Sequence, residues 1–191
     1  MPKWIGICLL LVCSWPEDVR ASLRTDLQKH YSNIAGLKSD VTQEKSGKYL
    51  AMPIKSTCKL EWKKNVIHWK TIKPVSSEII ITNGAISVRD ADGQESQMKQ
   101  SSPEIAALIQ FLQKIFSLDF SSLDKDFEFS ENGRVLIARA RPNGAVKFIH
   151  TFTLTFDSDL NIQNLVFDER NGKTMLTFQR VNVQRIPQGS L

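Results

Sequence analysis

A chain of 191 residues has the length of a single domain. With 41% hydrophobic and 24% charged residues it has the composition of a globular protein and not of a disordered or collagen-like one. The net charge of +5 is too small to indicate nucleic-acid binding by itself. Three Cys, three His and nine Gly exclude a multi-cysteine zinc site, a disulfide framework and a glycine-rich nucleotide loop.

Residues 1–21 have the pattern of a secretory signal peptide. Lys3 gives a positive start, the stretch from Trp4 to Trp15 is apolar, and Val19-Arg20-Ala21 offers small residues at the two positions that a signal peptidase reads. The apolar run is shorter than the ~20 residues of a membrane-spanning helix. The alternative is a lipoprotein signal with Cys13 as the lipidated residue, but Val12 is larger than the residue normally found before such a Cys. We therefore expect cleavage after Ala21 and a soluble, exported domain over residues 22–191, with Cys58 as its single cysteine.

The rest of the chain predicts helix, strands, helix, strands. Ser22 can cap a first helix, which we expect to end at Gly36. Strands are predicted from Leu37 to Val88, with a hairpin turn at Asn83-Gly84. A short helical turn is expected at 119–123, and further strands at 126–129, 135–141, 148–156, 162–168 and 173–182. Strands joined by such short turns must be antiparallel, and eight or more of them form a sheet that curls or closes.

The second predicted helix, residues 103–116, is apolar around most of its circumference. Ser102-Pro103-Glu104 provides its cap, its first-turn proline and its first-turn acid. A helix on an ordinary sheet needs an apolar arc of only about 100°. This helix is therefore either deeply buried in the core or a lid over an apolar cavity enclosed by the curled sheet. On the sheet, Phe152, Leu154 and Phe156 share one face with His150 by simple alternation.

No conventional catalytic or metal-binding pattern is present in the sequence. His30 falls in a helix, and His68 and His150 fall in strands, without the spacing of a metal site. The Asp90-Ala-Asp-Gly93 segment lacks the later ligands of a calcium loop and is better explained as a turn. Five lysines fall close together in the predicted strands, namely Lys59, Lys63, Lys64, Lys70 and Lys73. They would suit a basic patch, but we expect the alternation of side chains in strands to scatter them over two faces. We expect a protein that is not an enzyme and that needs no metal or cofactor, because no acid–base pair stands out.

The order of the motifs resembles the outer-membrane lipoprotein carrier family, LolA, over about residues 22–185. The family's Ala-x-Phe-x-Gln strand corresponds to Ser39-Asp40-Val41-Thr42-Gln43, and its Leu-x-Val-Lys-Arg-Pro-x-Leu-Phe-x-Trp segment to the stretch from Leu60 to Trp69. Pro74 and Ile79-Ile80-Ile81-Thr82-Asn83-Gly84 follow in the family's order. Later counterparts are Ser102-Pro103, Phe152-Thr153-Leu154 and the acidic hairpin from Asp168 to Lys173.

The resemblance implies a mainly β fold with helices: an unclosed, strongly curved antiparallel β-barrel, or half-barrel, covered by helices around a hydrophobic cavity. Such a periplasmic carrier shelters the acyl chains of lipoproteins between an inner-membrane lipoprotein-releasing transporter and an outer-membrane acceptor. We expect it to act as a monomer that binds no nucleic acid. The residues that the resemblance assigns to the cavity and its lid are Ile67, Trp69, Ile105, Leu108, Ile109, Leu112, Phe152 and Leu154.

Two departures from the family affect the expected mechanism. The family's Arg-Pro, whose Arg holds the lid shut, is Lys63-Lys64 here, so we expect Lys63 to latch the lid less firmly. The chain ends at Leu191, where carriers commonly continue, which bears on handover to partners more than on lipid binding. Two alternatives stay open: a lipid- or glycolipid-binding protein or sensor, and an outer-membrane acceptor of similar fold lipidated at Cys13.

Overall fold

The computed structural model describes residues 22–63, 66–82, 85–99 and 103–186; for residues 98–99 and 103–105 only the backbone is described. Within these ranges the chain forms two α-helices, one short 3₁₀ helix and eleven strands. In chain order they are α1 (Leu23–Tyr31), β1 (Ile34–Gly47), β2 (Ile54–Lys63), β3 (Val66–Lys73), β4 (Ser77–Ile81), β5 (Ala85–Arg89), β6 (Glu95–Lys99), α2 (Pro103–Phe116), η1 (Ser121–Leu123), β7 (Phe127–Asn132), β8 (Val135–Ala140), β9 (Ile149–Phe156), β10 (Ile162–Glu169) and β11 (Gly172–Arg185).

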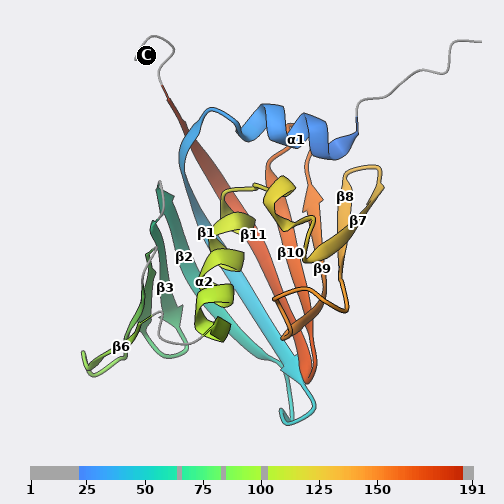
Figure 1. Cartoon of the computed structure of the whole chain (residues 1–191). Coiled ribbons are helices and arrows are strands. Elements are labelled where there is room, and N and C mark those ends of the chain that lie inside the picture. Colours follow the sequence, from blue (N-terminus) through green and yellow to red (C-terminus); the bar gives the residue numbers. More distant parts are fainter. Residues whose placement is uncertain (1–21, 64–65, 83–84, 100–102, 187–191) are drawn as a thin grey trace, which may run out of the picture.

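All eleven strands belong to one antiparallel sheet with the order β6-β5-β4-β3-β2-β1-β11-β10-β9-β8-β7. The long ladder between β1 and β11, from Ile34↔Arg185 to Gly47↔Gly172, joins the first half of the chain to the second. Because β6 and β7 stand at the two ends of the strand order, the sheet is open. Figure 1 shows α2 inside the curve of the sheet and α1 across one end of it. The predicted fold class, an unclosed, curved antiparallel sheet with helices, is confirmed.

Side chains of the sheet alternate between an inner face toward α2 and an outer face away from it. This alternation follows from the two-residue period of a strand. In β9 and β10 the buried inner side chains are Phe152, Leu154, Phe156, Leu165 and Phe167, and the threonines between them are less buried. The apolar core therefore lies between the inner face and the helices.

The start of α1 is fixed by its own cap and by the far edge of the sheet. The Ser22 hydroxyl accepts a hydrogen bond from the backbone N–H of Thr25 at 3.3 Å. The carboxylate of Glu131, on β7, accepts the backbone N–H groups of Leu23 at 2.7 Å and Arg24 at 3.1 Å. These bonds satisfy N–H groups that have no partner within the first turn of a helix. The beginning of the described chain is thereby held against β7.

The first helix is shorter than the sequence predicted. It ends at Tyr31, not at Gly36, because Ile34 already pairs with Arg185 of β11 and the sheet ladder takes over from the helix. The hydroxyl of Tyr31 donates a hydrogen bond to the carbonyl of Leu160 at 2.8 Å, and burial raises the pKa of this hydroxyl to about 12. The end of α1 is thus fixed to the β9–β10 connection.

Strands β6 and β9 also differ from what the sequence predicted. β6 is a polar edge strand that pairs only with β5, and no apolar pattern marks it. Near the start of β9 the register with β10 shifts between Asp168↔Thr151 and Glu169↔Ile149. As a result Ile149 is buried and His150 is exposed, so His150 does not share the inner face of Phe152.

Candidate lipid-binding cavity

A largely apolar cavity of about 340 Å³ lies between α2 and the inner face of the sheet. This volume is at the lower end of the 300–1,000 Å³ range of small-molecule pockets. Its apolar lining comes from both halves of the sheet and from α2: Ile67, Trp69, Ile79, Ile81, Leu108, Phe111, Leu112, Phe116, Phe148, Ile149, Phe167 and Leu176. Its polar lining is Gln43, Lys45, Glu169 and Thr174.

Strands β3 and β4 supply one wall through directly paired side chains. Ile67 pairs with Ile81, and Trp69 pairs with Ile79. Because these positions are two residues apart in each strand, all four side chains stand on the inner face. The Ile79-Ile80-Ile81 run therefore sends its first and third side chains to the cavity, while Ile80 lies on the outer face.

Helix α2 supplies the opposite wall with a row of side chains at helical spacing. Leu108, Leu112 and Phe116 are four residues apart, line the cavity and are only partly buried. Ile109 and Ile115, which flank this row on its two sides, are at most 1% exposed and belong to the core. The helix thus contributes side chains both to the core and to the wall of the cavity.

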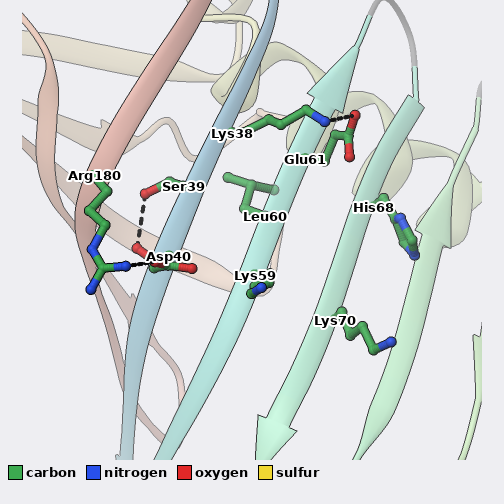
Figure 2. A pocket seen from close by; sticks show the side chains of 9 residues that line it. All are labelled: Lys38, Ser39, Asp40, Lys59, Leu60, Glu61, His68, Lys70 and Arg180. Carbon is green, nitrogen blue, oxygen red and sulfur yellow. Dashed lines mark hydrogen bonds and ion pairs between the residues drawn. The ribbon is translucent and has the colours of Figure 1, made fainter.

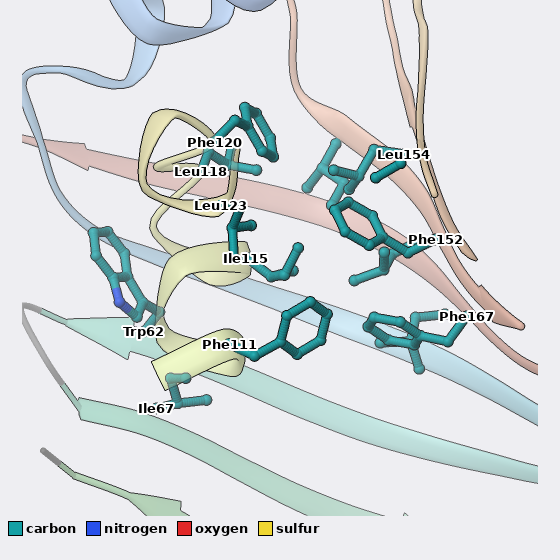
Figure 3. Packing of buried hydrophobic residues seen from close by; sticks show 14 of the residues in the cluster. Trp62, Ile67, Phe111, Ile115, Leu118, Phe120, Leu123, Phe152, Leu154 and Phe167 are labelled. Carbon is teal, nitrogen blue, oxygen red and sulfur yellow. The ribbon is translucent and has the colours of Figure 1, made fainter. Parts of the chain in front are cut away.

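Phe111 stands where the core and the cavity meet. Its ring centroid lies 5.6 Å from that of Phe127, 5.8 Å from Phe152, 6.0 Å from Phe148 and 6.1 Å from Phe167. Figure 3 shows its side chain projecting from α2 toward the strands of the second half. These tilted and edge-on ring contacts are the favoured arrangements of aromatic pairs. Phe111 therefore joins α2 to the sheet and closes one side of the cavity.

Polar groups border the cavity where β1 and β10 end and β11 begins; we call Lys45, Glu169 and Thr174 the polar rim. Lys45 pairs with Thr174 across β1 and β11. The hydroxyl of Thr174 donates a hydrogen bond to Oε1 of Glu169 at 3.0 Å. The cavity thus has an apolar interior and a polar border with one amine and one carboxylate.

The sequence-predicted cavity residues take three different positions. Ile67, Trp69, Leu108 and Leu112 line the cavity. Three others are fully buried in the core, namely Ile109, Phe152 and Leu154. For Ile105 the structure describes only the backbone. The apolar lining residues absent from the predicted set are Ile79, Ile81, Phe111, Phe116, Phe148, Ile149, Phe167 and Leu176. Ile79 and Ile81 could have been found from the Asn83-Gly84 hairpin turn and the alternation before it.

Lys63, the predicted lid latch, lies on the outer face near the end of β2. It borders a shallow depression with Glu61, Val66, His68 and Ile80. Its neighbour Trp62 is on the inner face, beside α2 in Figure 3. Alternation along the strand thus directs the Lys63 side chain away from the helix that it was expected to hold. The structure therefore does not support Lys63 as the latch.

The outer face of β1–β3 carries a charged hollow of about 400 Å³ (Figure 2). The hollow is lined by Lys38, Ser39, Asp40, Lys59, Leu60, Glu61, His68, Lys70 and Arg180. Lys59 and Lys70 are direct cross-strand partners, and Lys63 shares their face. The expectation that alternation scatters these lysines is wrong for these three, because antiparallel pairing brings equivalent positions of β2 and β3 to one face.

Ion pairs across the outer face balance most of its other charges. Lys38 pairs with Glu61 at 2.9 Å, and the hydrogen bond from Lys38 lowers the pKa of that carboxyl. The His68 ring lies 2.7 Å from the carboxylate of Glu78 and lowers its pKa in the same way. Exposed pairs of this kind are screened by water and contribute little to stability. This surface is solvated and lacks the buried geometry of a catalytic site.

Cys58 lies fully buried on the inner face of β2, and burial raises the pKa of its thiol. A protonated, buried thiol is a poor nucleophile.

Among the described residues there is no group of three or more His, Cys, Asp or Glu side chains that could hold a metal ion. The same residues contain no helix long and apolar enough to span a membrane. Several sequence predictions fall outside the described residues: the signal peptide at 1–21, Lys64, the Asn83-Gly84 turn and the Ser102 cap.

The fold and the cavity define an open antiparallel β-sheet protein with an apolar cavity between its sheet and an inner helix. No family model matches the chain, and no curated protein matches it.

Solved structures similar to this chain include LolA superfamily proteins. A DUF1329 family protein from Desulfovibrio piger is 8% identical, with a TM-score of 0.46, covering 88% of this chain and 92% of that one. The LolA superfamily protein NE2245 from Nitrosomonas europaea is 10% identical, with a TM-score of 0.43 and coverage of 87% and 96%. The Mycobacterium tuberculosis lipoprotein LppX is 13% identical, with a TM-score of 0.44 and coverage of 84% and 94%.

Proposed function

We propose that this protein is a periplasmic carrier that sequesters the acyl chains of lipoproteins in the cavity beneath α2 and transfers them from the inner to the outer membrane. The observation that carries the proposal is the cavity itself, with its apolar walls on α2 and on β3–β4 and its polar rim. Removing acyl chain from water is favourable by about 0.8 kcal/mol per buried CH₂. The function needs no covalent chemistry.

The walls of the cavity suit reversible binding. Leu108, Leu112 and Phe116 pack through side chains, and their partial exposure leaves apolar surface that an acyl chain can cover. Movement of α2 away from β3 and β4 would break side-chain contacts but no sheet hydrogen bonds. Such a helix can act as a lid that opens for loading and delivery.

The polar rim fits the junction between an acyl chain and its polar attachment. An acylated N-terminus has ester and amide groups beside its hydrocarbon chains, and these groups need hydrogen-bond partners when they leave water. Lys45 and Thr174 can donate to their carbonyl oxygens at the border of the cavity. The chain is thus enclosed while the protein part of the cargo stays outside.

The test is release of lipoproteins from the inner membrane. Spheroplasts of a Gram-negative bacterium carrying the releasing transporter are incubated with the purified exported protein, and the supernatant is examined for soluble complexes by native mass spectrometry. We expect a one-to-one complex with an acylated lipoprotein. A complex with a free lipid or glycolipid, or an acylated Cys13 at the N-terminus, would contradict the carrier role and support the alternatives.

A matched pair of variants separates the cavity from the general surface. Ile79→Glu puts a carboxylate into the cavity wall, whereas Ile80→Glu puts the same group on the outer face of the same strand. We expect Ile79→Glu to abolish complex formation and Ile80→Glu to retain it, with circular dichroism showing that both variants are folded. Equal activity of the two variants would contradict binding in this cavity.

A further inference from the structure

The connection between β1 and β2, residues 48–53, exposes large apolar side chains to solvent. Tyr49 is 78% exposed and Met52 is 73% exposed; we call these two residues the apolar tip. The adjoining strand start adds Ile54, which is 46% exposed. Figure 1 shows this connection projecting from the lower end of the molecule, opposite α1. Isolated apolar side chains on a surface are ordinary, but a group gathered on a projecting loop indicates an interaction site.

The connection between β3 and β4 also exposes an apolar side chain. Lys73, at the end of β3, pairs with Thr57, so the β3–β4 connection meets β2 four residues beyond the end of the β1–β2 connection. It carries Val75, which is 63% exposed, directly after Ile72 and Lys73 of β3. Two connections on the same side of β2 and β3 thus expose apolar side chains.

The base of the projecting connection is firmly held. Gly47 and Gly172 are cross-strand partners that allow close backbone approach, because a Cβ on Gly172 would collide with the carbonyl of Ser46. The backbone N–H of Lys48 donates to the carbonyl of Asn171 at 2.9 Å, and that of Leu50 donates to Gly47 at 3.0 Å. The apolar tip is therefore presented on a fixed support.

The same end of the sheet holds the polar border of the cavity. Lys45 and Thr174 are paired two residues before Gly47 and two residues after Gly172, and both line the cavity. Phe148, which is 37% exposed, lines the cavity and is the last residue of the β8–β9 connection. A surface that contacted the apolar tip would therefore lie next to the border through which cargo enters.

Lysines surround the apolar tip and define the charge of its partner. Lys48 is exposed beside Tyr49, with its Nζ 5.9 Å from the ring centroid. Lys55 follows Ile54 and pairs with Glu44 at 3.2 Å, and Lys73 is exposed beside Val75. Apolar side chains flanked by Lys are typical of surfaces that enter the interface of an anionic membrane, where Tyr places its ring among acyl chains and its hydroxyl in water.

We propose that this end of the protein docks on anionic phospholipid membranes, with Tyr49 and Met52 inserted into the interface and Lys48 and Lys73 against the headgroups. Docking places the polar rim at the membrane surface, so that an acyl chain passes between bilayer and cavity with a short path through water. The inference goes beyond the proposed function, since it holds for any acylated or lipid cargo.

The test is sedimentation of the exported protein with vesicles of phosphatidylcholine, with and without phosphatidylglycerol. We expect binding to the anionic vesicles that weakens with salt. The double substitution Tyr49→Ser and Met52→Ser is expected to lower the partition coefficient about a hundredfold, since each buried apolar side chain contributes about tenfold. Lys48→Gln should lower it about fivefold and reduce its salt dependence. Val66→Ser, at the opposite end of β3, removes an exposed apolar side chain and should change nothing.

Two outcomes would overturn the inference: no binding of the unaltered protein to anionic vesicles, or equal loss of binding in Val66→Ser and in the double variant. Binding of a fluorescent fatty acid in solution is measured on the same samples, and we expect the double variant to retain it. Loss of membrane docking with intact fatty-acid binding separates failure of this inference from failure of the proposed carrier function.

Discussion

Replacing Phe111 by Ala tests the connection between the core and the cavity. The Phe111 side chain is 1% exposed, and its ring contacts four other Phe rings, which come from β7, the residue before β9, β9 itself and β10. Removing a fully buried Phe side chain costs about 3–5 kcal/mol, because the transfer free energy is lost and a void remains. This is a large part of the 5–15 kcal/mol that typically stabilises a domain.

The position of the void gives a second, more specific expectation. Since Phe111 also lines the cavity, its removal enlarges the space available to an acyl chain. An apolar ligand can occupy a void of this kind, and ligand at a hundred times its dissociation constant stabilises the folded state by about 2.7 kcal/mol. We therefore expect a fatty acid to recover much of the stability lost in Phe111→Ala.

The assay is urea unfolding followed by the fluorescence of Trp62 and Trp69, with and without fatty acid. Phe156→Ala is the matched control, because Phe156 is 3% exposed in the core but does not line the cavity. It should lose similar stability and gain no more from the ligand than the unaltered protein gains. A loss below about 1 kcal/mol in Phe111→Ala, or the same recovery by ligand in both variants, would refute this reasoning.

Three further predictions follow from the fold and its surface. Gly172→Ala should destabilise the protein by about 1–3 kcal/mol, because the added Cβ meets the backbone carbonyl of Ser46; thermal unfolding measures it, and an unchanged midpoint would contradict the close approach. Burial, followed by the charge of Arg185, lowers the pKa of His30 below 6.5, and Nε2 of His30 is buried without a hydrogen-bond partner. Because the unfolded chain protonates His30 more readily than the folded protein does, the stability that neutral His30 contributes is present above pH 6.5 and is lost as the pH falls through the folded-state pKa. In urea titrations the free energy of unfolding should therefore fall less steeply with decreasing pH in His30→Phe than in the unaltered protein, and parallel curves would argue against this role. Lys63→Arg should leave the rate of fatty-acid release unchanged, since the side chain lies on the outer face. Slower release in stopped-flow fluorescence would support Lys63 as a latch of the lid.

Local patterns predicted most of the sheet because its turns are short and its inner positions apolar. Strands β7 to β11 were expected from their turns and are found within a few residues of the predicted ranges. The end of α1 was missed because pairing of Ile34 with β11, which lies far along the chain, overrides helical spacing. The position of His150 was missed because a register shift cannot be seen in a single strand. β6 was missed because an edge strand needs no apolar face.

The cavity was predictable as a region but not as a set of side chains. The nearly all-apolar helix left a core helix and a lid over a cavity as alternatives, and the sequence cannot say that Leu108 and Leu112 face the cavity while Ile109 faces the core. That division depends on how α2 is rotated against a sheet formed by distant strands. The grouping of Lys59 with Lys70 has the same origin, because it depends on the register between β2 and β3.

The central claim, that acyl chains bind between α2 and the inner face, is tested most directly by photo-crosslinking. A palmitate analogue with a diazirine at the end of its chain is bound to the exported protein and irradiated, and the labelled residues are mapped by mass spectrometry. If acyl chains bind there, we expect labels on Leu108 or Leu112 of α2 and on Trp69 or Ile79 of the facing strands. Labels confined to the outer face around Lys59 and Lys70 would contradict it.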